Sequence, residues 1–374
     1  MVGAGPAGAL LSYRLAGAGA SVTVFDPSHP REKPCGGGLT AKALALLPPA
    51  PAGDPLPARF VDRCAFESGE GDRVDLALAS PVAVCSRREL DAWLLRRATE
   101  AGARHAAERV VEVDGSGRLR TKDGRDEGFD VVVGADGAGS LVRRTLLAPT
   151  PPARLGMAVG WFARGSSPML VRFLPGLAGY LWLFPRRDHV GVGICAPLGT
   201  IPTRALRARL EAQIARDFPA LADDGTAPYA HTIPSPSVEP ASILEIAGPR
   251  WALVGDAAAL ADPITGEGIC YALRSAAVLA DTLLAEGSPA RYPERALGAF
   301  GRELLKAAAL HDRFYAPGFA RRMVRYSARS EAIRTVMRDL VLGEQGYLDL
   351  KPRLLRALPR FLLQASLPRR RSAA

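Results

Sequence analysis

Three glycines near the amino terminus have the spacing of a pyrophosphate-binding turn. Gly3, Gly5 and Gly8 form a Gly-x-Gly-x-x-Gly sequence, and Asp26 follows eighteen residues after the last of them. In such turns the first glycine allows a tight bend, the second lets the backbone approach the phosphates, and the third permits close helix packing. A carboxylate at Asp26 suits a pair of ribose hydroxyls, so this segment is predicted to bind a dinucleotide.

Two other segments carry side chains that could act on a substrate. Cys35 precedes three consecutive glycines, 36–38, whose bare backbone could lie against a flat ring system. A free thiol is mostly protonated at neutral pH and could donate a proton. Further on, strand alternation predicts that Tyr180, Trp182 and Phe184 project to one side. These three aromatic side chains could line a pocket or belong to an ordinary core.

The predicted elements show how these residues would be brought together. Strands at 21–25, 129–137 and 251–256 and helices at 9–18, 86–98 and 266–284 fit one nucleotide fold, interrupted by several strands between 155 and 196. We therefore expect an α/β protein: a Rossmann-like domain with an inserted, mainly antiparallel β-sheet domain and a C-terminal helical region. The expected domain ranges are 1–150, with 48–85 partly inserted, then 151–245, 246–290 for the return segment, and 291–374.

The first strand is short in this sequence. Only Met1 and Val2 precede the glycine turn, whereas a typical strand has ~5–6 residues. We expect the natural start to lie roughly five residues upstream, because a central strand of two residues would leave neighbouring backbone groups unpaired.

The cysteine pattern indicates a reducing compartment. The five cysteines are odd in number and contain no Cys-x-x-Cys pair, which argues against a disulfide framework and against a zinc site. No apolar run approaches the ~20 residues of a spanning helix, and no leader is evident. A cytoplasmic protein, or one peripheral on the inner face of the cell membrane, is predicted.

The net charge of +10 is concentrated at the carboxyl end. Residues 314–374 hold twelve Arg and one Lys against four acidic residues, and the basic residues alternate with apolar ones. Amphipathic basic helices of this kind suit an anionic membrane surface. A solvated face of helices packed on the body explains the pattern equally well. Nucleic acid is not expected as a partner, because nothing resembles a base reader.

Acidic residues at three strand ends, Asp26, Asp136 and Asp256, the last two beside glycines, resemble the pattern of the flavin-binding fold of p-hydroxybenzoate hydroxylase. The resemblance implies FAD as the cofactor. It places Arg88, in the segment 87–91, near the cofactor phosphates, and the amino end of the helix after residue 265 at the flavin. The residues predicted to bind FAD are Gly3, Gly5, Pro6, Ala7, Gly8, Asp26, Gly36, Gly37, Gly38, Arg88, Asp136, Gly137, Gly255, Asp256, Gly266, Gly268 and Ile269.

Two motifs narrow the resemblance. Residues 34–38, Pro-Cys-Gly-Gly-Gly, and residues 180–185, Tyr-Leu-Trp-Leu-Phe-Pro, look like signatures of the geranylgeranyl reductase family. The likeness extends over roughly 1–284. It implies reduction of isolated C=C bonds in a polyprenyl chain, with Cys35 facing the flavin and Tyr180 and Trp182 lining an isoprenoid channel.

Such a reduction needs a hydride and a proton on opposite carbons. FAD would supply the hydride, and water, Cys35 or Tyr180 could supply the proton. The faces of Tyr180 and Trp182 could also stabilise developing positive charge. The sequence does not choose among these donors.

Other readings stay open at this point. An FAD monooxygenase or halogenase of the same fold is one alternative, although halogenases carry a Trp-x-Trp-x-Ile-Pro motif with a separate lysine. An inactive flavin- or lipid-binding protein is another. The electron donor could be NADPH or a ferredoxin. The substrate could be a prenyl diphosphate, a chlorophyll-type or archaeal-type lipid, or a quinone side chain, and the oligomeric state is not predicted.

Overall fold

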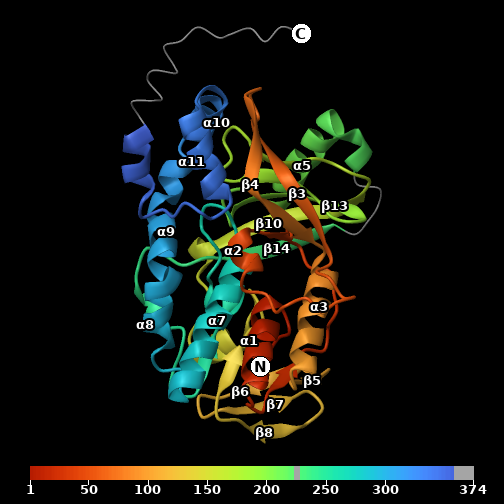
Figure 1. Cartoon of the computed structure of the whole chain (residues 1–374), viewed down its shortest axis with the longest axis vertical. Coiled ribbons are helices and arrows are strands. Elements are labelled where there is room, and N and C mark those ends of the chain that lie inside the picture. Colours follow the sequence, from red (N-terminus) through yellow and green to blue (C-terminus); the bar gives the residue numbers. More distant parts are fainter. Residues whose placement is uncertain (223–227, 358–374) are drawn as a thin grey trace.

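The computed structural model describes residues 1–222 and 228–357. The glycine-turn domain occupies one end of the molecule and a large sheet the other, with the C-terminal helices along one side (Figure 1). Within the described ranges, no helix is both long enough and apolar enough to cross a membrane.

The Rossmann-like domain is built on short parallel strands. β1 (Thr23–Phe25) pairs with β5 (Arg104–Ala106), and β9 (Val132–Gly134) pairs with β15 (Trp251–Leu253). Val2 bridges both pairs, to Phe25 and to Gly134, so it lies at the centre of this sheet. Because parallel strands end at the same edge, Asp26, Asp136 and Asp256 come together there. The predicted fold class is confirmed.

The second sheet has eight strands in the order β14-β10-β13-β12-β11-β3-β4-β2. All its pairings are antiparallel except β11 with β3, which is parallel. The strands are β2 (Gly38–Leu39), β3 (Ala58–Ser68), β4 (Arg73–Cys85), β10 (Leu155–Arg164), β11 (Met169–Phe173), β12 (Tyr180–Pro185), β13 (His189–Pro197) and β14 (Tyr229–Pro234). One face packs on α5 and the other faces the Rossmann-like domain.

Helices cover both sheets. A small third sheet, β6-β7-β8, closes the lower end of the Rossmann-like domain in the view of Figure 1. Its strands are β6 (Val110–Val113), β7 (Arg118–Thr121) and β8 (Asp126–Gly128). The longer helices are α1 (Pro6–Gly17), α3 (Arg87–Glu100), α5 (Thr203–Asp217), α7 (Ile269–Glu286), α9 (Arg302–Phe314), α10 (Phe319–Arg329) and α11 (Glu331–Val341). The shorter ones are α2 (Ala41–Leu44), α4 (Leu141–Leu146), α6 (Ala241–Leu244) and α8 (Tyr292–Ala296).

The C-terminal helices pack on the body through both apolar and ionic contacts. Val324 of α10 and Met337 of α11 join a core cluster with the β3–β4 hairpin. At the hairpin turn, Arg321 pairs with Glu70, and both Arg321 and Arg325 pair with Asp72. Part of the basic tail is therefore engaged with the body, as the packed-helix alternative predicts.

Candidate active site: a cofactor cleft that opens into an apolar chamber

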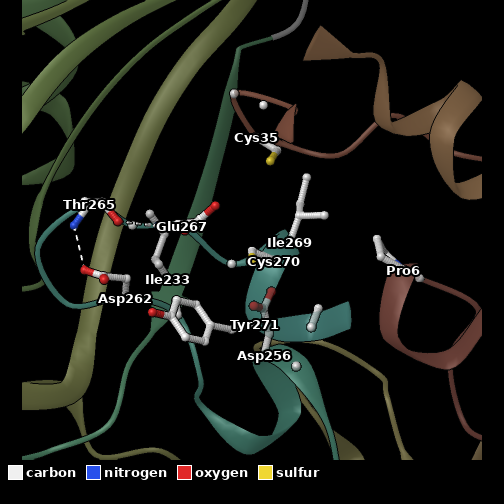
Figure 2. A pocket seen from close by; sticks show the side chains of 18 of the residues that line it. Pro6, Cys35, Ile233, Asp256, Asp262, Thr265, Glu267, Ile269, Cys270 and Tyr271 are labelled. Atoms are coloured by element: carbon white, nitrogen blue, oxygen red, sulfur yellow. Dashed lines mark hydrogen bonds between the residues drawn. The ribbon is translucent and has the colours of Figure 1, made fainter. Parts of the chain in front are cut away.

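A cavity of about 910 Å³ lies between the Rossmann-like domain and the large sheet. Figure 2 shows part of it, where Cys35, Asp256, Glu267 and Ile269 surround one space. The predicted site residues that line it are Gly3, Gly5, Pro6, Ala7, Asp26, Cys35, Gly36, Gly37, Gly38, Asp136, Gly137, Tyr180, Trp182, Gly255, Asp256, Gly266, Gly268 and Ile269. Only Gly8 and Arg88 of the predicted set do not.

The glycines of the first turn have different physical roles. A Cβ on Gly8 would lie 2.1 Å from the carbonyl oxygen of Gly3, so Gly8 is required by the turn itself. A Cβ on Gly5 would meet only Nη2 of Arg87, at 3.9 Å. The fold therefore has room for a Cβ at Gly5, so the bare backbone there is not required by packing within the protein.

The arginine beside this turn is Arg87, not the predicted Arg88. Arg88 is exposed, whereas Arg87 is buried and lines the cavity. Both Nε and Nη2 of Arg87 donate to Asp91 at 2.8 Å, which holds the guanidinium beside Gly5. Successive side chains of a helix point about 100° apart. Choosing the residue one position too late in α3 therefore selects a side chain on the solvent face. The spacing Arg-x-x-Leu-Asp in fact begins at Arg87.

Two of the carboxylates at the strand ends, Asp26 and Asp256, have lowered pKa values. Burial alone would raise the pKa of Asp26, but hydrogen bonds from Ala4 and Ser28 and the charge of Arg31 lower it. Burial likewise opposes ionisation of Asp256, yet Lys33, whose Nζ lies 3.0 Å from Oδ2, keeps that pKa below its usual value. Both carboxylates are thus ionised and able to accept hydroxyl hydrogens.

Asp136 is already used within its own turn. Its carboxylate accepts from the Ser140 hydroxyl at 2.5 Å and from the Leu141 N–H at 2.7 Å, as a helix-capping group does. Burial raises the pKa of Asp136.

Lys33 was not among the predicted site residues, and no local pattern marks it, because its partner Asp256 is distant in the sequence.

The far end of the cavity is apolar. Tyr180, Trp182 and Phe184 face it, while Leu181 and Leu183 pack on the opposite side of the sheet, as strand alternation predicts. We call this region the apolar chamber; its lining includes Phe66, Met169, Val171, Phe173, Tyr180, Trp182, Phe184, Phe314, Met337 and Val341. Phe173 meets Phe314 of α9 at a ring distance of 6.0 Å. The C-terminal helices therefore form one wall, which the sequence analysis did not predict.

Cys35 lies where the cleft meets the chamber and is only partly exposed. Its Sγ accepts a hydrogen bond from the N–H of Gly37 at 3.3 Å. The other four thiols are buried, and burial raises the pKa of Cys64, Cys85 and Cys270 to about 12 and that of Cys195 to about 11. Cys35 is therefore the accessible thiol of the five.

Glu267 is a buried carboxyl of this site whose pKa is raised toward neutrality. Burial, and then the charge of Asp262, raise its pKa from 4.5 to about 7. Its weak contact with the Thr40 hydroxyl, at 3.5 Å, does little to offset this. The folded protein thus binds the Glu267 proton more tightly than the unfolded chain does.

Glu267→Gln is expected to flatten the pH dependence of stability in FAD-free protein. In the wild type, stability should fall as the pH rises from about 4.5 to about 7, because the folded state resists losing this proton. The glutamine variant should remove about 2–3 kcal/mol of that loss between pH 5 and pH 8. Urea unfolding at the two pH values measures it, with the exposed Glu294→Gln as control. Identical pH dependence in wild type and Glu267→Gln would contradict the assignment.

Comparison with known proteins identifies the family. The family described as FAD binding domain matches residues 1–236. A menaquinone reductase of Mycolicibacterium smegmatis is 32% identical over 315 residues, covering 77% of this chain and 76% of that protein. A geranylgeranyl diphosphate reductase of Rhodobacter capsulatus is 27% identical over 316 residues, covering 78% and 76%. The chain belongs to the geranylgeranyl reductase family of FAD-dependent oxidoreductases.

Membership of the geranylgeranyl reductase family settles the cofactor and the class of reaction. FAD is the cofactor, and the protein is an oxidoreductase that acts on CH–CH groups. The fold agrees. A geranylgeranyl bacteriochlorophyll reductase-like protein from Thermoplasma acidophilum superposes with a TM-score of 0.74, covering 95% of this chain and 98% of that one at 21% identity.

Proposed function

We propose that this enzyme saturates isolated C=C bonds in a polyprenyl chain carried on a lipid, a diphosphate or a quinone. The observation that carries the proposal is the direct opening of the cofactor cleft into the apolar chamber. A polyprenyl chain offers almost no polar group for recognition, so it needs a long apolar wall of this kind. The similarity to a menaquinone reductase favours a quinone as the carrier.

The residues of the cleft fit FAD. The amino end of α1 offers free N–H groups to a pyrophosphate. Arg87 and Lys33 line the cleft and bring positive charge to it, and Asp26 and Asp256 are ionised acceptors for hydroxyl groups. We assign these residues, with Gly5, to holding the cofactor, and the turn 266–268 to the flavin end.

Reduced FAD held in this cleft would supply the hydride chemistry, and a protein group would have to donate a proton to the other carbon of the double bond. The hydroxyl of Tyr180 donates to the carbonyl of Thr265, and burial raises its pKa well above its usual value. Loss of this proton would leave a buried phenolate, which disfavours Tyr180 as the donor. Cys35 is the better placed acid, while the faces of Tyr180 and Trp182 stabilise developing positive charge.

A panel of prenyl substrates tests this function. Photoreduced enzyme should be incubated without oxygen with a prenyl diphosphate, a prenyl quinone and a prenyl glycerolipid, followed by mass spectrometry. Saturation adds two daltons for each bond reduced, and the quinone is reoxidised before it is weighed because reduction of its ring also adds two daltons. With oxygen present, a gain of sixteen daltons would instead support the monooxygenase alternative, and no change in any substrate would support an inactive binding protein.

We also propose that the basic tail docks the enzyme on an anionic membrane. Beyond the paired Arg321 and Arg325, several basic side chains of the tail are exposed, among them Arg322, Arg329 and Arg356. No carboxylate pairs with these three in the described part of the chain. The same C-terminal region also exposes the apolar side chains of Leu348, Leu354 and Leu355. Together they offer charge and apolar area to a lipid surface, and a membrane-dissolved prenyl chain could pass from it into the chamber.

Neutralising Arg322, Arg329 and Arg356 to Gln is expected to weaken binding to anionic vesicles about 100-fold, since each basic residue contributes ~1 kcal/mol there. Co-sedimentation with anionic and neutral vesicles measures this, at low and high salt. The matched control neutralises Arg321 and Arg325, which already pair with Asp72. Equal binding to both kinds of vesicle, or equal loss in both variants, would contradict the docking. Arg369, Arg370 and Arg371 lie outside the described residues.

A further inference from the structure

The two family signatures form one packed unit. A Cβ on Gly36 would lie 2.6 Å from the ring of Phe184, and one on Gly38 would lie 3.2 Å from it. Gly37 has a φ of +79°, and a Cβ there would lie 2.1 Å from the carbonyl oxygen of Cys85. Bare backbone at 36–38 is thus required by protein packing, and the flat ring it lies against is that of Phe184.

Arg186 follows β12 directly and holds the loop that contains Cys35 and residues 36–38. Its side chain is buried, with 1% of the residue exposed. Nη2 donates to the carbonyl oxygen of Cys35 at 2.7 Å, and Nη1 donates to Oε1 of Glu32 at 2.8 Å. The guanidinium also lies 4.7 Å from the ring centre of Phe162. A charged donor at a backbone carbonyl makes one of the stronger protein hydrogen bonds.

Glu32 completes the arrangement from within the loop. Besides Arg186, it accepts from the Ser86 hydroxyl at 2.5 Å and from the N–H of Arg87 at 3.0 Å. Burial opposes its ionisation, but the charge of Arg186 and these hydrogen bonds lower its pKa. The buried guanidinium therefore has an ionised partner, without which its burial would be costly.

We propose that Arg186 is a positioning residue: with Glu32 it holds the backbone of Cys35, and so the thiol, at the junction between the cofactor cleft and the apolar chamber. This positioning role is argued from the contacts of Arg186 and Glu32 alone. Its importance for turnover depends on the proposed function, in which Cys35 donates a proton.

The test measures alkylation of Cys35 by iodoacetamide in folded protein, with and without FAD, and needs no substrate. The other four thiols are buried with raised pKa values, so Cys35 is expected to react first. Because Cys64 and Cys270 also line the cavity, peptide mass spectrometry assigns the alkylated residue. Arg186→Met should speed alkylation about tenfold, because a charge-assisted hydrogen bond no longer opposes opening of the loop. Arg186→Lys, which keeps the charge but cannot span both acceptors, should give a smaller increase.

A charge exchange separates positioning from stability. The double variant Glu32→Arg with Arg186→Glu should recover part of the melting temperature lost in Arg186→Glu alone. Its alkylation should stay fast, because a carboxylate cannot donate to the carbonyl of Cys35. Arg172→Met is the matched control, since Arg172 is also buried, lies in β11 beside β12, and pairs with Glu67 and Asp217. It should lose stability but alkylate within twofold of the wild type.

Two results would overturn the proposal. One is that Cys35 is alkylated at the wild-type rate in both Arg186→Met and Arg186→Lys, although their melting temperatures are lower. The other is that Cys35 is alkylated at the wild-type rate in the Glu32→Arg, Arg186→Glu double variant. Failure of every prenyl substrate would instead count against the proposed function and leave the alkylation result standing.

Discussion

Gly5→Leu is expected to give folded but colourless protein. In the FAD-free fold a Cβ at this position meets only the tip of Arg87, at 3.9 Å, and the rest of the side chain can extend into the open cleft. The same space is needed by a cofactor pyrophosphate that approaches the bare backbone. FAD affinity should therefore fall at least ~100-fold, equivalent to about 3 kcal/mol, while the melting temperature of the FAD-free form changes little.

The control for this variant is Gly8→Ala. Its Cβ would lie 2.1 Å from the carbonyl oxygen of Gly3, so it should destabilise the fold itself. Flavin absorbance after reconstitution and thermal unfolding of the FAD-free proteins distinguish the two effects. Full flavin content in Gly5→Leu would show that the cofactor does not lie on this turn.

Val171→Trp is expected to close the apolar chamber. Val171 lies opposite Trp182 on the neighbouring strand and lines the cavity, so an indole there would fill space that a prenyl chain needs. We expect kcat/KM for a long prenyl substrate to fall ~100-fold or more, because a blocked pocket must repack before the chain can enter. The flavin content should be retained.

Substrate length provides an internal check on this variant. A short prenyl substrate should lose less activity than a long one, and Val238→Trp, at an exposed position outside the cavity lining, should change neither. Unchanged turnover of the long substrate by Val171→Trp would mean that the chain does not pass through the chamber.

Local patterns predicted the cofactor side of the site because its residues are close in sequence to the turns that position them. The glycine turn, the strand before Asp26 and the face shared by Tyr180 and Trp182 all follow from spacing alone. The choice of Arg88 shows the limit, because the arginine that lines the cavity is Arg87. A helix start shifted by one residue is a small error in the sequence but reverses burial and exposure.

Residues that act through distant partners could not be predicted in this way. Lys33 pairs with Asp256 only because the fold brings the end of β15 beside it. Arg186 pairs with Glu32 only because two segments far apart in the sequence meet in the fold. The basic tail is ambiguous for a different reason. Amphipathic helices look alike whether their apolar face meets a membrane or a protein core, and the structure shows that α10 and α11 pack on the β3–β4 hairpin.

The most direct measurement of the central claim is a single turnover of photoreduced enzyme with menaquinone in D2O, without oxygen, followed by reoxidation of the quinone ring and mass spectrometry. Both transferred hydrogens exchange with solvent beforehand, so saturation of a prenyl bond predicts a stable gain of four daltons, located in the chain by fragmentation. Reduction of the ring alone would leave no mass gain after reoxidation. An unlabelled chain with oxidised flavin would contradict the account.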